Sequence, residues 1–356
     1  MRLTGIAAGI LVLAASAYPL ARPIASRASA MDRGAFQESS PRGPLIDRSR
    51  PSQESQTPRQ QEPPQSSAPL QVQTTVVNVF TTVRDRHNGI VSDLTKNDFK
   101  VFEDGTEQKI SYFTKEVDLP LSLAIMMDTS GSMQEILSAE KEAASNFVQE
   151  VMHKKDEAVV MSFDTDVNLL ADFSEDPGVL QHAIRRAEIN VDASGIGGTG
   201  GTVPSRGGGT NLYDAVYLAA HDELASEAGR KAIILLTDAE DTGSKLSEND
   251  AIESAQRADA VLHFILIIDP SASEGYGPGV ASKMAHETGG RVINVRNDRG
   301  LEKAFDTIAE ELRSQYVIGY YPTNTKHDGT FRKIRVDVDR ADLKILARKG
   351  YYAPSR

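Results

Sequence analysis

The stretch LPLSLAIMMDTSGSM, residues Leu119–Met133, decides the fold that the rest of the chain must fit. Its first part is an almost continuous apolar run, which is typical of a parallel strand buried on both faces. The run ends at Asp128, and Ser130 and Ser132 follow at alternate positions around Gly131. In an open α/β sheet, ligands bind beyond the carboxyl ends of the strands. The stretch therefore predicts a buried strand that brings one acid and two hydroxyls to a ligand site.

The segment from residue 119 to residue 313 alternates apolar runs with stretches of helical periodicity. The expected strands include DEAVVMSFD, VNLLADF, RKAIILLTD, AVLHFILIID and RVINVR, and the expected helices begin at Gln134, Pro177, Leu212, Asp250, Gly279 and Arg299. This order predicts an α/β domain with a doubly wound, mainly parallel sheet. His263 lies inside one apolar run, so we expect it to be a packed core residue.

Two β-rich segments flank this domain. Residues 71–118 contain VQTTVVNVFTTV, whose Val and Thr content favours a strand, and DFKVFEDGTEQKISYF, which predicts two strands joined at Asp104-Gly105. Residues 314–356 contain QYVIGYYP, FRKIRVDVD and LKILARKGYYA, each expected to form a strand. Because neither segment is long enough to be stable alone, we expect them to pair into one β-sandwich, with the α/β domain inserted between them.

The N-terminus has the order of a secretory signal. Arg2 precedes an apolar run from Gly5 to Leu20, and the small residues Ala28-Ser29-Ala30 follow. Residues 1–30 are therefore expected to be a signal peptide or, alternatively, an uncleaved N-terminal anchor. Either one predicts an exported protein that is periplasmic, secreted or associated with the cell envelope. Residues 31–70 are rich in Pro, Gln and Ser, which predicts a disordered linker.

The composition excludes several kinds of site and partner. The chain has 356 residues, a net charge of −11 and no cysteine, so disulfides, thiolate metal sites and cysteine nucleophiles are excluded. An acidic chain argues against nucleic acid as a partner, and against a membrane surface except through the N-terminal anchor. The same acidity is compatible with binding of a cation.

Two further segments carry oxygen donors to the same edge of the expected sheet. Thr210 precedes a helix in GGGTNLYDA, and Asp238 ends the strand in ILLTDAED. Together with Asp128, Ser130 and Ser132, they form a set of hard oxygen donors that suits Mg²⁺, Mn²⁺ or Ca²⁺. Each residue also has an ordinary alternative role. Thr210 could be a helix N-cap, Asp238 a turn acid, and the two serines partners of backbone amides.

Asp128-Thr129-Ser130-Gly131-Ser132, Thr210 and Asp238 resemble, in this order, the three parts of the metal-ion-dependent adhesion site of von Willebrand factor type A domains. The resemblance covers residues 119–313, and the flanks DLTKNDFKVFEDG and YVIGYYPTN resemble those of exported von Willebrand A-related proteins of Acidobacteria. It implies that the two serines bind the metal directly, and that the two acids bind it directly or through water. Thr210 would enter or leave the coordination shell. A carboxylate of a protein partner would complete it, which implies adhesion without catalysis.

Two other functions remain open from the residues. A metal-dependent phosphohydrolase using Asp128 would usually need a second acid two residues later, where this chain has Ser130. The serines have no G-x-S-x-G context, and the Gly-rich segment 194–209 lacks the Lys-Ser/Thr ending of a P-loop. A scaffold that needs no metal is the second alternative. The Gly-rich segment is either a flexible rim that shapes partner choice or a tolerated surface insertion.

Overall fold

The computed structural model describes residues 76–115, 119–189, 209–268 and 277–355. The expected signal peptide and linker lie outside these ranges, as does the Gly-rich segment up to residue 208. Within these ranges, every helix is too short or too polar to cross a membrane.

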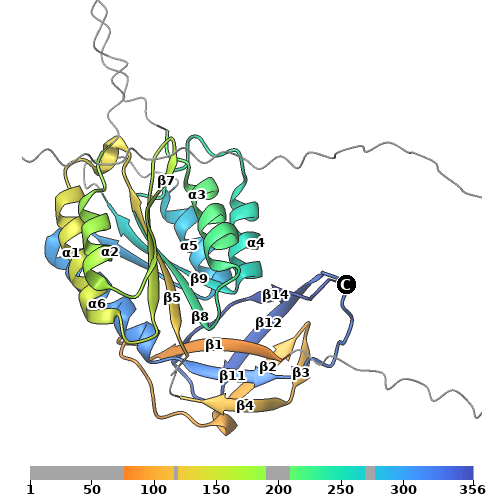
Figure 1. The fold of residues 1–356 in the computed structure, drawn as a ribbon. Helices are drawn as coiled ribbons and strands as arrows, with labels where there is room; N and C mark the ends of the chain where they lie inside the picture. Colours follow the sequence, from red (N-terminus) through yellow and green to blue (C-terminus); the bar gives the residue numbers. More distant parts are fainter. Residues whose placement is uncertain (1–75, 116–118, 190–208, 269–276, 356) are drawn as a thin grey trace, which may run out of the picture. The chain divides into compact units, whose positions relative to one another are not determined.

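A six-stranded sheet forms the centre of the α/β domain, in the order β10-β9-β8-β5-β6-β7 (Figure 1). Its strands are β5 Leu121–Asp128, β6 Glu157–Phe163, β7 Val167–Ser174, β8 Arg230–Thr237, β9 Ala260–Ile267 and β10 Val292–Val295. All neighbouring strands are parallel except β7, which pairs antiparallel with β6 at the edge. Strand β5 lies inside the sheet with every residue buried, which confirms the prediction from its apolar run.

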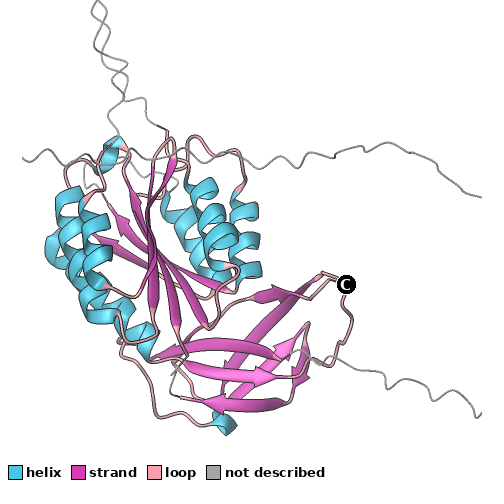
Figure 2. Cartoon of the chain, in the orientation of Figure 1, coloured by secondary structure: helices cyan, strands magenta, loops and turns pink. Residues whose placement is uncertain are grey.

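Helices cover both faces of this sheet (Figure 2). One face packs against α1 Leu137–Val151, α2 Pro177–Arg185 and α6 Asp298–Arg313, and the other against α3 Leu212–Leu218, α4 Glu248–Ala258 and α5 Gly277–Thr288. A π-helix, Ala219–Leu224, continues α3. Alternate residues of β5 supply the two cores: Leu123 and Ile125 pack with α1, whereas Ala124 and Met126 pack with α3. The doubly wound, mostly parallel α/β fold is confirmed.

Two four-stranded antiparallel sheets flank the domain, in the orders β13-β1-β11-β4 and β14-β12-β2-β3. Their strands are β1 Val77–Arg84, β2 Phe99–Glu103, β3 Thr106–Gln108, β4 Ile110–Thr114, β11 Tyr316–Tyr320, β12 Phe331–Val338, β13 Lys344–Leu346 and β14 Gly350–Tyr352, and a 3₁₀ turn, Lys96–Asp98, precedes β2. Each sheet combines strands from both sides of the α/β domain, and one hydrophobic cluster contains residues of both sheets. Two expectations were wrong in detail: DFKVFEDGTEQKISYF forms three strands rather than two, and LKILARKGYYA divides into β13 and β14, which belong to different sheets.

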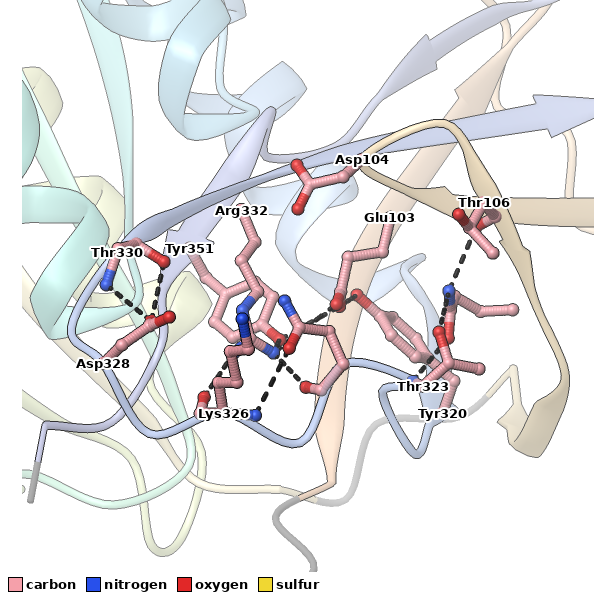
Figure 3. Close-up of polar contacts among 12 residues, drawn as sticks. Glu103, Asp104, Thr106, Tyr320, Thr323, Lys326, Asp328, Thr330, Arg332 and Tyr351 are labelled. Carbon is pink, nitrogen blue, oxygen red and sulfur yellow. Dashed lines mark hydrogen bonds and ion pairs between the residues drawn. The ribbon is translucent and has the colours of Figure 1, made fainter.

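A buried carboxylate joins the two flanks (Figure 3). Glu103 on β2 accepts hydrogen bonds from the hydroxyls of Tyr320 at 2.8 Å and Tyr351 at 3.0 Å, and its Oε1 lies 3.5 Å from Nη1 of Arg332. Arg332 also donates to two backbone carbonyls of the loop that follows β11. Burial, reinforced by Glu103, raises the pKa of Tyr351 to about 12, so the phenol remains a donor. These contacts bring β2, β11, β12 and β14 together around one acid.

Arg230, at the start of β8, joins the segments through which the chain enters and leaves the α/β domain. Its backbone N–H donates to the Pro120 carbonyl at 2.9 Å, and its guanidinium donates to the carbonyls of Leu119 and Leu312. The preceding Gly229 has a φ of +90°, and a Cβ there would lie 2.4 Å from the Pro120 oxygen. Only glycine fits so close an approach in that conformation.

A second buried ionic group lies where β1 meets the α/β domain. Glu311 on α6 accepts a hydrogen bond from Nε of Arg84 at 2.6 Å and lies 3.1 Å from Nη1 of Arg291. His263 is buried beside it, with Nδ1 3.9 Å from Glu311. Burial, together with the charges of Arg291 and Arg84, lowers the pKa of His263 to about 3, so its ring is neutral at pH 7. The expected core position of His263 is confirmed, whereas its ionic neighbours were not predicted.

We predict that Arg230→Ala lowers the free energy of unfolding by about 3 kcal/mol, because it removes the guanidinium donors to the buried Leu312 carbonyl and to the partly exposed Leu119 carbonyl. Urea denaturation followed by circular dichroism measures this loss. Arg340→Ala is the matched control, because among the described residues Arg340 takes part in one exposed ion pair, with Asp93. Equal losses in the two variants would contradict the joining role of Arg230.

Candidate metal centre

Asp128 ends β5 and is completely buried. Its Oδ1 accepts a hydrogen bond from the Ser130 backbone N–H at 2.9 Å, and its Oδ2 accepts one from the Thr237 hydroxyl at 2.6 Å. The parallel register pairs Met127 of β5 with Leu236 of β8, so Asp128 and Thr237 end their strands side by side. The carboxylate is therefore held both by its own loop and by the neighbouring strand.

The two serines of the loop lie next to each other. Ser130 precedes a single 3₁₀ turn, Gly131–Met133, and the turn brings the Ser132 hydroxyl oxygen to 3.1 Å from that of Ser130. Two oxygens in neighbouring positions of an octahedral Mg²⁺ shell are about 3.0 Å apart, because each Mg–O bond is about 2.1 Å. Ser130 is buried and Ser132 is exposed. The pair therefore has the spacing of two ligands of one cation, on a side that solvent can reach.

Asp164, which follows β6, connects this loop with the segment that carries Thr210. The Thr129 hydroxyl donates to Oδ2 of Asp164 at 2.8 Å, and the Thr129 backbone N–H donates to the Phe163 carbonyl at 2.8 Å. The Asn211 backbone N–H donates to the Asp164 carbonyl, also at 2.8 Å. Asp164 thus contacts both the loop that follows β5 and the segment that carries Thr210.

Thr210 is attached to the loop after β8 through its backbone. Its N–H donates to the Thr242 hydroxyl at 2.9 Å, and its carbonyl accepts from the N–H groups of Thr242 and Gly243 at 3.0 and 3.2 Å. The N-cap residue of α3 is Asn211, so the alternative role of Thr210 as a helix cap was wrong. Across the described ranges, the Thr210 hydroxyl has no recorded hydrogen bond, which leaves it available as a ligand.

Asp238 is half-buried at the end of β8, and its Oδ1 accepts a hydrogen bond from the Glu240 N–H at 3.0 Å. This is the contact expected of a turn acid. The next residue, Ala239, has a φ of +59°, and its N–H donates to the Thr237 hydroxyl at 2.9 Å. The Thr237 hydroxyl therefore connects the two acids: it donates to the carboxylate of Asp128, and it accepts from the Ala239 N–H in the turn that carries Asp238.

Asp128 and Asp238 are close enough to interact electrostatically. Burial is the main cause that raises the pKa of Asp128 to about 7; the hydrogen bonds from Ser130 and Thr237 oppose this rise, and the charge of Asp238 adds to it. A buried carboxylate with a second acid nearby is favoured in its charged form by an adjacent cation. The burial of Asp128 and the nearby charge of Asp238 thus favour binding of a positively charged ligand at this site.

The donor set restricts how such a cation could be held. In the part of the chain that the structure describes, no group of three or more His, Asp or Glu side chains could hold a metal ion by itself. A cation between Asp128 and Asp238 would therefore need the hydroxyls of Ser130, Ser132 and Thr210, with waters in the remaining positions. Hard oxygen donors of this kind fit Mg²⁺, Mn²⁺ or Ca²⁺.

Of the five sequence-predicted ligands, the structure brings Asp128, Ser130 and Ser132 into one hydrogen-bonded loop, with Asp238 within electrostatic reach. The Thr210 segment is linked to that loop indirectly, through Asp164, which accepts from the Asn211 N–H and from the Thr129 hydroxyl. Sequence reasoning missed Thr237 and Asp164. Both could have been noticed as polar residues at the ends of apolar runs, but their partners depend on the strand register.

We predict that Asp128 makes the metal-free protein less stable as the pH rises. An acid whose pKa is raised from 3.8 to about 7 on folding contributes stability that is fully present below pH 3.8 and is lost as the pH rises through 7. Asp128→Asn should therefore gain stability relative to the wild type between these values and keep the gain above them. Urea denaturation in chelator at a series of pH values measures the difference, and a difference that does not change with pH would contradict the assignment.

Residues 123–240 match a family model described as the von Willebrand factor type A domain. Solved structures to which the chain is similar include a von Willebrand factor type A protein from Catenulispora acidiphila (15% identity, TM-score 0.44, covering 73% of this chain and 75% of that one). Proximal thread matrix protein 1 from the mussel byssus, with a zinc-occupied MIDAS motif, has 15% identity and a TM-score of 0.45, over 58% of this chain and 48% of its own. The vWF domain of the type V pili tip protein Mfa5 from Porphyromonas gingivalis has 15% identity and a TM-score of 0.41, over 56% and 96%.

No curated protein matches the chain. The match to the family model includes Asp128, Ser130, Ser132, Thr210 and Asp238. The chain therefore contains a von Willebrand factor type A domain.

Proposed function

We propose that this chain is an exported protein that binds an acidic group of a protein partner through a divalent cation. The cation, Mg²⁺ or alternatively Mn²⁺ or Ca²⁺, would be held by Asp128, Ser130, Ser132, Thr210 and Asp238. The observation that carries the proposal is the pair of serine hydroxyls 3.1 Å apart beside a buried carboxylate. Two cis ligands of one octahedral ion have this spacing.

The proposed residues divide into those that would bind the cation directly and those that would position its other ligands. Ser130 and Ser132 supply neutral oxygens, so they add no charge to the ion. Asp128 is already engaged at both oxygens, by the Ser130 amide and the Thr237 hydroxyl, which favours binding of the metal through water. Few direct anionic ligands leave a cation with strong attraction for another anion. A carboxylate of the partner can supply that charge.

Binding of this kind needs no bond to break, and we propose that the protein is not an enzyme. A phosphohydrolase would need an acid poised to protonate the leaving group. Two residues after Asp128 the chain has Ser130, whose hydroxyl is paired with that of Ser132. A scaffold that needs no metal remains the other candidate, and metal titration separates the two.

Two parts of the proposal concern the rest of the chain. Residues 1–30 would direct export, as a cleaved signal or a retained anchor, and would place the domain in the periplasm, in the cell envelope or outside the cell. The two flanking antiparallel sheets would pack as a β-sandwich, which the shared hydrophobic cluster of Val79, Val101, Tyr316 and Ile334 supports.

We predict that the purified chain binds Mg²⁺ and Mn²⁺ saturably, and that Asp128→Ala removes this binding because the variant lacks the buried charge of the site. Isothermal titration calorimetry measures the affinity, with circular dichroism as a check on folding. Asp166→Ala is the matched control, because Asp166 is an exposed acid near the end of the neighbouring strand β6. Wild-type protein that binds no ion at millimolar metal would exclude the proposed function.

We also predict that the metal-loaded protein adheres to beads that carry carboxylate groups and not to matched beads that carry amides. The chain has a net charge of −11, so without a bridging cation it should be repelled by the carboxylate beads. Chelator and Asp128→Ala should each abolish adhesion. Adhesion that survives both treatments, or phosphatase turnover that depends on Asp128, would favour a different function.

A further inference from the structure

Glu140 occupies an unusual position on α1. It lies in the first turn of the helix, with no exposed surface, and the structure records no hydrogen-bond partner for either carboxylate oxygen. Its neighbours on the buried side of α1 are Leu137, Ala144 and Phe147, which pack against the central sheet. An acid at such a position costs free energy unless a partner compensates for it.

The charges that act on Glu140 come from the metal centre. Burial is the main cause that raises the pKa of Glu140 well above its usual range, and the charges of Asp128 and Asp238 raise it further. Cationic side chains are absent from these causes. The two acids that would hold the cation are therefore also the groups with which Glu140 interacts electrostatically.

The path of the chain explains this proximity. The loop that carries Ser130 and Ser132 leads through one 3₁₀ turn directly into α1. The first turn of the helix therefore follows the loop closely along the chain, and Glu140 is the acid that this turn buries. Glu135 precedes the helix, and Glu142 lies on it; both are exposed, so they are ordinary surface acids.

We infer that Glu140 is a third acid of the metal centre, whose negative charge stabilises a cation held by the five expected ligands. This inference rests on the proposed function. It adds a residue outside the five expected ligands and assigns the orphaned carboxylate a partner. Direct coordination is not part of it, because in the described residues no three acids are close enough to share an ion by themselves.

The role is that of a positioning residue that balances charge. The carboxylate of Glu140 would add negative charge and a hydrogen-bond acceptor near the residues that would hold the cation. With Asp128 and Asp238, Glu140 makes three negative groups around two positive charges. Glu140 would thereby lower the net positive charge of the loaded site, which would favour retention of the metal over a high affinity for a partner's carboxylate.

We predict that Glu140→Gln weakens Mn²⁺ binding about ten-fold, which is the usual effect of losing a residue that supports the ligands of a metal. The variant keeps the size and shape of the side chain. Its metal-free form should melt no lower than the wild type, because a buried acid without a hydrogen-bond partner has been removed. Calorimetric titration with Mn²⁺ gives the affinity, and circular dichroism melting with and without metal gives the stability.

Glu142→Gln is the matched control, with the same change of charge on an exposed position of the same helix. A loss of affinity in Glu140→Gln no larger than in Glu142→Gln overturns the inference. A lower melting temperature without metal, at unchanged Mn²⁺ affinity, also overturns it, because that result assigns Glu140 a structural role. Failure of the proposed function is distinct, since in that case the wild type itself would bind no metal.

Discussion

The parallel pairing of β5 with β8 is the constraint on which the candidate site depends. Its register ends both strands at the same edge, so the Thr237 hydroxyl reaches the buried Asp128 carboxylate at 2.6 Å. The same hydroxyl accepts the Ala239 N–H, and this fixes the turn that carries Asp238. A shift of one residue would turn these side chains to the opposite face of the sheet. The two acids are neighbours because two apolar runs, far apart in the chain, are in register.

The fold could be predicted in outline because its strands are apolar runs and its helices have a clear period. The details that could not be predicted are local. Helix α1 begins at Leu137 rather than Gln134, because the chain first forms the 3₁₀ turn Gly131–Met133 that brings the serines together. The strands of LKILARKGYYA separate because three-residue strands have too weak a pattern to show where one ends and to which sheet it belongs.

Only part of the candidate site could be predicted from the sequence, namely the residues that lie in loops at the ends of strands or before a helix. Asp128, Ser130, Ser132, Thr210 and Asp238 stand out because they follow strands or precede a helix. Glu140 does not, although its spacing carried a signal: Leu137, Glu140, Ala144 and Phe147 recur on one helical face, and an acid on a buried face is uncommon. The sequence therefore shows that Glu140 is an acid on an apolar helix face. Which charges lie near it could be learned only from the structure, because Asp128, Asp238 and Glu140 belong to three different elements or loops.

The positions of the two ends of β5 have a mechanical consequence. The candidate metal edge lies at its carboxyl end, whereas Arg230 holds both connecting segments at the other end, next to Leu119 and Leu312. If a partner binds at this edge as proposed, its pull would act on the carboxyl end of β5. Both of its neighbours run parallel to it, so their ladders of hydrogen bonds would be strained in shear and share the load, rather than opening one bond at a time.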